Sequence, residues 1–129
     1  MLKQLALVLV LSAVFSDSAA AEWTEIASSS ASEGTPVVVY ADYTTIRKRG
    51  DKVKMWVLFN YPTAQRGLLG KTYLSQTRQV EYDCKEETAK TLYQVLVSGP
   101  MGTGDPVSTI NSPEERPSPV VPSSFGEAL

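Results

Sequence analysis

Hydrophobic and polar residues alternate with a period of two over most of the chain that follows residue 22. This pattern is typical of half-buried β-strands. The clearest case is segment 53–61, whose two faces would carry Val53, Met55, Val57 and Phe59 on one side and Lys52, Lys54, Trp56 and Leu58 on the other. The segment is therefore predicted to be a strand with one apolar face and one partly basic face.

The same pattern predicts a series of strands at Trp23–Ser28, Val37–Tyr43, Val53–Tyr61, Thr72–Cys84, Leu92–Ser98 and, more briefly, Val107–Ile110. Segment 47–51 is predicted to be the turn of a hairpin, because Gly50 adopts positive φ without strain. Pro62 is expected to end its strand because it has no N–H for the ladder. Gln76 and Arg78 lie on the otherwise apolar face of segment 72–84, which predicts that this strand is bulged or that its face is only partly covered. The fold class is mainly β (α+β), a single antiparallel meander sheet of five to six strands.

The two ends of the chain differ from this middle. Leu5 to Phe15 is apolar apart from Ser12, and the small residues Ala19–Ala21 follow, which predicts a signal peptide over residues 1–21. The apolar run is too short for a membrane span, which needs about 20 residues. The β domain would occupy residues 22–111. Residues 112–129 form a Pro/Ser-rich tail, where the capping-box spacing of Ser124 and Glu127 predicts the start of a truncated helix.

Charge is distributed unevenly along the chain, whose net charge is −2. Ten Lys/Arg and five Asp/Glu lie between Arg47 and Lys90. This basic middle is either a solvated strand face or a patch for an acidic protein partner. The candidate binding residues are Arg47, Lys48, Arg49, Lys52, Lys54 and Lys71, with Trp56 as an apolar contact.

Several kinds of chemistry are missing from the sequence. There is no histidine, which removes Ser-His-Asp and Cys-His catalysis and the usual zinc sites. The interpretation that remains for an enzyme needs a pocket that gathers Asp42, Glu81 or Asp83. Because the usual catalytic and zinc-binding sets are absent, we predict no enzyme, no cofactor and no metal. Basic and aromatic residues interleave around Trp56, but an exported location argues against a nucleic-acid partner.

Cys84 is the single cysteine. Thiols usually pair in the oxidising compartments that exported proteins enter. A lone cysteine there indicates intermolecular pairing, a free thiol, or a pairing partner lost from the chain. These alternatives include a homodimer joined through Cys84.

The order of landmarks resembles the surface-adhesin E family of small exported Gram-negative proteins. The matching segments are Trp23, Val39–Asp42, the basic turn 47–50, Val53–Val57, Ser75–Cys84 with its Glu81-Tyr82-Asp83-Cys84 run, Tyr93, the glycine-rich segment 99–104, and Pro122 to Leu129. The resemblance implies an antiparallel sheet, a C-terminal helix, and a disulfide from Cys84 to a cysteine near the end of that helix. That second cysteine is absent here, which leads us to hypothesise a truncated or frame-altered copy.

The resemblance also implies a function, attachment to host extracellular-matrix proteins. We therefore predict an exported, non-enzymatic binding module of the bacterial envelope, located in the periplasm or on the outer cell surface, that recognises a protein partner. The alternative is a structural or accessory periplasmic protein with no host ligand, which self-associates through a sheet edge or Cys84.

Overall fold

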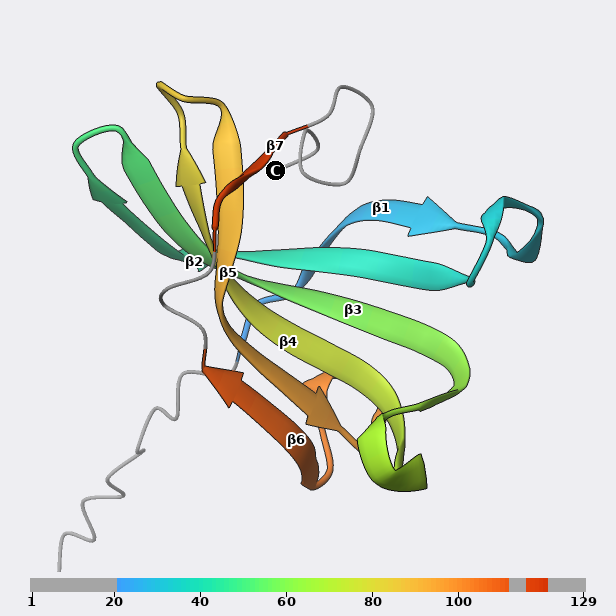
Figure 1. The fold of residues 1–129 in the computed structure, drawn as a ribbon. Helices are drawn as coiled ribbons and strands as arrows, with labels where there is room; N and C mark the ends of the chain where they lie inside the picture. Colours follow the sequence, from blue (N-terminus) through green and yellow to red (C-terminus); the bar gives the residue numbers. More distant parts are fainter. Residues whose placement is uncertain (1–20, 112–115, 121–129) are drawn as a thin grey trace, which may run out of the picture.

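The computed structural model describes residues 21–111 and 116–120. Its main feature is one antiparallel sheet in meander order, built from β1 (Thr24–Ser29), β2 (Val37–Arg49), β3 (Lys52–Arg66), β4 (Thr72–Asp83), β5 (Thr88–Val97) and β6 (Pro106–Asn111) (Figure 1). A two-residue strand, β7 (Ser118–Pro119), pairs with Thr88 and Ala89 of β5. The predicted antiparallel meander is confirmed.

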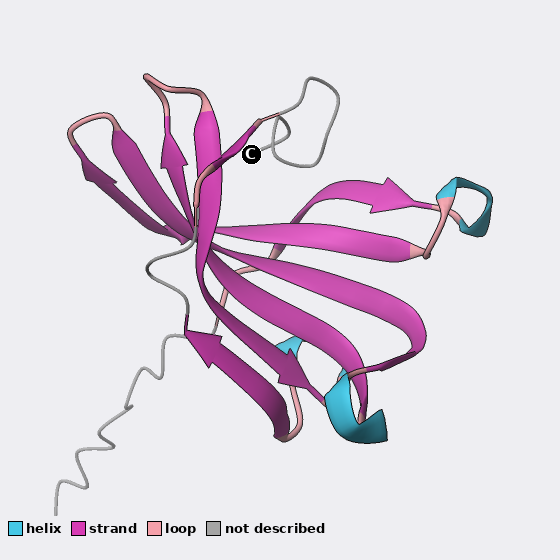
Figure 2. Ribbon diagram, viewed as in Figure 1, coloured by secondary structure: helices cyan, strands magenta, loops and turns pink. Residues whose placement is uncertain are grey.

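Helical structure in the described residues is limited to three 3-10 turns in the connections, η1 (Ala31–Glu33), η2 (Leu68–Gly70) and η3 (Pro100–Gly102) (Figure 2). None of these helices is long and apolar enough to cross a membrane. The predicted signal peptide falls on residues 1–21, of which only Ala21 is described. The predicted helix start at Ser124 and Glu127 lies outside the described residues.

One face of the sheet carries the main hydrophobic core. Alternate residues of β2, β3 and β4 point to this face, and Ala41, Met55, Val57 and Val80 are at most 8% exposed. The register places Ala41 opposite Val57 and Met55 opposite Val80. This face takes its apolar side chains from the parity that the sequence predicted for segment 53–61. Its partly buried margin is formed by Ile26, Phe59, Tyr82 and Ala89.

The opposite face is also closed in its middle, although by a loop. Leu58 is 0% exposed, and Gly102 of η3 lies against Leu58 and Thr77. Polar contacts hold this loop in place: the Ser75 hydroxyl donates to the Gly99 carbonyl at 2.7 Å and accepts from the Gly102 N–H at 2.9 Å. The face of β3 that carries Lys52 and Lys54 is therefore exposed at the lysines and buried further along the strand, at Leu58.

Two strands run further than the sequence predicted. β2 was expected to end at Tyr43 and β3 at Pro62, yet β2 continues to Arg49 and β3 to Arg66. Both extensions cross an irregular stretch, between Asp42 and Arg47 in β2 and between Asn60 and Gln65 in β3. A bulge tolerates a residue without ladder pairing, so Pro62 does not terminate β3. The expected end at Pro62 was wrong for this reason.

Residues 43–46 form the bulge of β2, and Thr45 holds it together. Its hydroxyl donates to the Asp42 carbonyl at 2.7 Å and accepts from the Trp56 N–H at 3.0 Å. The side chain thus replaces a backbone partner where the ladder is interrupted. Beyond the bulge, Arg47 pairs with Lys54 and Arg49 with Lys52. The turn is therefore shorter than the expected 47–51 and lies at Gly50 and Asp51.

The bulge predicted for the fourth strand lies in β5 instead, because Gln79 pairs with Tyr93 and Val80 with Thr91, so Leu92 of β5 is the extra residue. Gln76 nevertheless faces inward and is 4% exposed. Its amide nitrogen donates to the Tyr61 hydroxyl at 2.6 Å, and its amide oxygen accepts from Arg78 at 3.1 Å and from Gln94 at 2.7 Å. A satisfied amide network explains how this polar residue is buried.

Tyr82 gives the fold a dependence on high pH. Burial raises the pKa of its phenol from 10.0 to about 12. Between these values the unfolded chain loses the phenolic proton while the folded chain keeps it, so stability that is present below pH 10 is lost as pH rises towards 12. We expect a loss on the order of 1–2 kcal/mol, discounted for partial exposure. Urea unfolding of Tyr82→Phe against wild type from pH 8 to 12 measures it; parallel curves would contradict the assignment.

Candidate cation-lined binding site

The exposed end of the β2–β3 hairpin carries four cationic side chains on one face. Cross-strand pairing sets Arg47 opposite Lys54 and Arg49 opposite Lys52. Alternation along each strand then points these four side chains to the same side of the sheet. They line a surface hollow of about 480 Å³ together with Glu81 of β4. We call these five residues the basic hollow.

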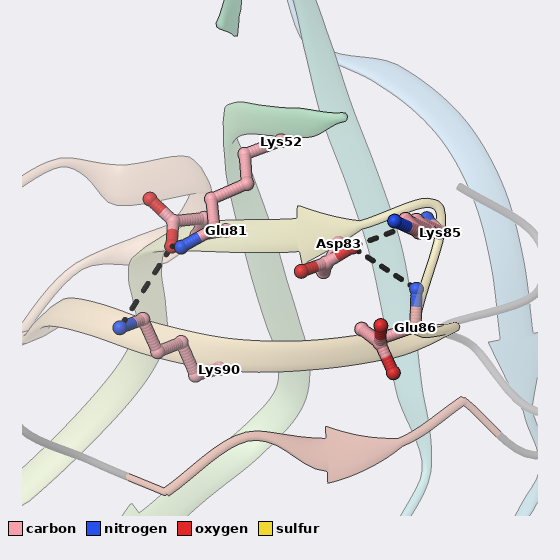
Figure 3. A network of polar contacts seen from close by, with 6 residues as sticks. All are labelled: Lys52, Glu81, Asp83, Lys85, Glu86 and Lys90. Atoms are coloured by element: carbon pink, nitrogen blue, oxygen red, sulfur yellow. Dashed lines mark hydrogen bonds and ion pairs between the residues drawn. The ribbon is translucent and has the colours of Figure 1, made fainter. Parts of the chain in front are cut away.

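Glu81 is the carboxylate of the basic hollow, and two lysines share it. Lys52 Nζ lies 3.9 Å and Lys90 Nζ 3.8 Å from Glu81 Oε1. Figure 3 shows Glu81 on β4 between Lys52 of β3 and Lys90 of β5. Both separations are at the long end for an ion pair, and the Lys52 side chain is 55% exposed. Such pairs contribute about 0–1 kcal/mol. Because Glu81 is a single carboxylate among four lining cations, it neutralises only part of the local positive charge.

Arg47 is positioned by the bulge of β2. Its Nη1 donates to the Ile46 carbonyl at 2.9 Å and to the Thr44 carbonyl at 3.3 Å. In the described part of the chain, no carboxylate lies within 4.0 Å of the charged groups of Arg47, Arg49 or Lys54. These three cations are exposed, so their charges are available to an acidic ligand.

The adjacent β4–β5 turn supports the rim of the basic hollow. Asp83 Oδ1 accepts from the backbone N–H of Lys85 at 3.1 Å and of Glu86 at 3.0 Å, which closes the turn (Figure 3). The Cys84 N–H donates to the Asp51 carbonyl at 2.9 Å and joins this turn to the β2–β3 turn. The two turns therefore hold each other in place. The Asp83 carboxylate therefore has a structural role in closing the turn.

A second, smaller hollow of about 260 Å³ lies on the same face, around Trp56. It is lined by Ala21, Trp23, Asp42, Thr44, Thr45, Trp56 and Thr77. Trp56 is partly buried and meets Tyr93 edge to face, with ring centroids 5.8 Å apart. This contact with β5 orients the indole, and its remaining surface lines the hollow. Trp56 is therefore a neighbour of the basic hollow, two residues from Lys54 along β3.

The structure separates the remaining candidate residues from this site. Lys48 pairs with Val53 and alternates to the other face of the hairpin. Lys71 lies between η2 and β4, at the end of β3 remote from the hairpin turn. Cys84 is exposed and forms no disulfide in this structure. Its predicted pairing in a homodimer stays a prediction.

Sequence reasoning did not single out Glu81 or Lys90 for the binding site. Lys90 lies before the predicted strand Leu92–Ser98, whereas it belongs to β5 and pairs with Glu81. Register is the signal that finds both: pairing β3 with β4 puts Lys54 opposite Glu81, and pairing β4 with β5 puts Glu81 opposite Lys90. The described residues contain no group of three or more His, Cys, Asp or Glu side chains able to hold a metal ion.

Fold and site together define a small antiparallel-β domain with a cation-lined surface. The family model described as Surface-adhesin protein E matches residues 23–129, so the chain belongs to this family. No curated protein and no solved structure matches the chain. Family membership confirms the predicted resemblance and indicates an exported, cell-surface adhesin that binds a protein or host partner.

Proposed function

We propose that this protein attaches to an acidic segment of a partner protein through the basic hollow, and that the partner belongs to the host extracellular matrix. The observation that carries the proposal is the gathering of Arg47, Arg49, Lys52 and Lys54 around a single carboxylate. Arginine suits such a role because its planar guanidinium binds carboxylates in two-pronged fashion. The family's adhesin role supplies the class of activity.

The exposure of the site favours recognition over catalysis. Exposed cations steer an acidic partner and fix its orientation, and they contribute modestly to affinity. Apolar contact strengthens attachment, and the neighbouring Trp56 is of a residue type enriched at binding hot spots. The basic hollow would therefore set specificity and association rate, while the hollow beside Trp56 would supply contact area.

Charge reversal tests this proposal. Arg47→Glu/Arg49→Glu reverses two charges inside the basic hollow, and Lys48→Glu/Lys71→Glu reverses two charges outside it with the same change in net charge. We expect the first pair to weaken binding to immobilised matrix proteins about tenfold at low salt, from about 0.7 kcal/mol for each lost pair. Surface plasmon resonance at about 50 and 500 mM salt measures the effect, which should shrink as salt screens the charges.

The control pair should bind within about twofold of wild type. Equal weakening by both pairs would show a response to net charge alone and would remove the basic hollow from consideration. Absence of wild-type binding to every matrix protein tested would overturn the assignment of a matrix partner.

A further inference from the structure

Asp42 is a buried carboxylate that lies close in space to Glu22, near the start of the described chain. It is 2% exposed. Its Oδ1 accepts from the Thr44 N–H at 3.0 Å and from the Thr44 hydroxyl, and its Oδ2 accepts from the backbone nitrogen of Glu22 at 3.2 Å. While residue 22 is joined to residue 21, all three donors are neutral. A buried anion surrounded by neutral donors is costly unless a countercharge approaches it.

No side-chain cation supplies that countercharge in the described part of the molecule. The ion pairs there involve Glu81 and not Asp42. The hollow beside Asp42 is lined otherwise by alanine, tryptophan and threonine side chains. The nearest group that is able to become positive is therefore the backbone nitrogen of Glu22, which becomes an amine only if the chain is cut immediately before it.

We propose that the chain is processed between Ala21 and Glu22, and that the new α-ammonium group of Glu22 forms a structural ion pair with Asp42. Ala21 and Glu22 are both exposed residues and precede β1. Ala19 and Ala21 provide the small residues that a leader peptidase requires before the cut. Two independent observations, the sequence pattern and the position of a buried carboxylate, therefore point to the same bond.

The processing step is a hydrolysis catalysed by a leader peptidase and consumes one water. The C–N bond between Ala21 and Glu22 breaks, and the water hydroxyl bonds to the Ala21 carbonyl carbon. The resulting acid releases its proton to the Glu22 nitrogen, which carries the other water hydrogen. The products at neutral pH are an alanine carboxylate on the leader and an ammonium on the domain, since an α-amino group ordinarily has a pKa of about 7.7–8.0.

Cleavage thus strengthens an existing contact. A hydrogen bond between two ionised groups is roughly twice as strong as a neutral one. The Glu22 contact joins the residues before β1 to β2, which already pair from Thr24 opposite Ala41. The processed chain should therefore hold its first strand more firmly than the unprocessed chain does.

Two measurements test the proposal. Mass spectrometry of protein recovered from the cell envelope is expected to show Glu22 as the first residue; any other first residue would overturn it. Thermal unfolding at pH 7 then compares protein that begins at Glu22 with protein that keeps Ala20 and Ala21 before it. We expect the Glu22 form to melt about 4–8 °C higher, the shift typical of one such interaction in a domain of this size.

Asp42→Asn introduced into both forms is the control and should abolish the difference. A difference that survives in the asparagine pair, or equal melting of the two wild-type forms, would contradict the ion pair. If the asparagine variants do not fold, acetylation kinetics decide: the α-amino group of the folded Glu22 form should react several-fold more slowly than in urea. Equal rates would contradict the ion pair.

Discussion

Leu58→Ala is expected to lower the free energy of unfolding by about 2–5 kcal/mol, the cost of deleting a fully buried leucine side chain. Leu58 is 0% exposed and lies under η3, on the face of the sheet opposite the main core. The truncation leaves a cavity there, because the strands on either side are fixed by their ladders and cannot collapse into it. Urea unfolding followed by tryptophan fluorescence measures the loss.

Leu69→Ala provides a matched control for this prediction. Leu69 lies in η2 and is 95% exposed, so the same chemical change there removes no buried contact. We expect it to alter stability by less than about 0.5 kcal/mol. Similar losses in the two variants would show that Leu58 is not part of a packed second layer.

Gly104→Ala is expected to destabilise the protein by about 2–5 kcal/mol, through two effects that add. Gly104 has φ +89°, where a side chain costs about 1–2 kcal/mol. An added Cβ would also lie 2.5 Å from Ser98 Oγ and 2.7 Å from the Gly99 nitrogen, and overpacking of this kind costs about 1–3 kcal/mol. The substitution should loosen the connection that positions η3 over Leu58.

Gly70→Ala separates these two effects. Gly70 has a similar φ of +71°, but an added Cβ there meets nothing within 4 Å. We expect this variant to lose only the conformational part, about 1–2 kcal/mol. Equal losses at both glycines in chemical denaturation would mean that close packing at Gly104 contributes nothing.

Side-chain alternation predicted the meander because each strand has one face on the core, and one residue of slip would expose it. The interruptions in the ladders were harder to foresee. Pro62 carries a strand-ending signal, whereas segment 43–46 consists of strand-favouring residues, yet both strands are interrupted there by a bulge and then resume. Resumption depends on partners distant in sequence, such as the Thr45 hydroxyl that accepts from the Trp56 N–H. Local composition does not contain that information.

The same limit applies to the candidate site. Arg47 and Arg49 are near Lys52 and Lys54 in sequence, so a hairpin brings them together once its turn is recognised. Lys71 is part of the same basic stretch of sequence but lies at the other end of β3. Lys90 becomes a neighbour only through the pairing of β4 with β5. Cross-strand register, which the charge pattern alone does not determine, decides the membership of the site.

We propose that a single arrangement connects the fold to the adhesin role of the family. The β2 bulge and the two joined turns keep the hairpin extended, and the extended hairpin presents four cations on one face. A flexible loop of the same composition would lose more conformational entropy on binding. The rigid hairpin would avoid part of that loss when it meets an acidic partner.

Nuclear magnetic resonance titration of ¹⁵N-labelled protein with a ten-residue glutamate peptide at low salt tests this claim most directly. We expect amide shifts at Arg47, Arg49, Lys52, Lys54 and Lys90 that saturate together and diminish with added salt. Lys71 and the β6 strand should remain unchanged. Shifts centred on Lys71, or scattered over the whole surface with no saturation, would contradict a binding site at the basic hollow.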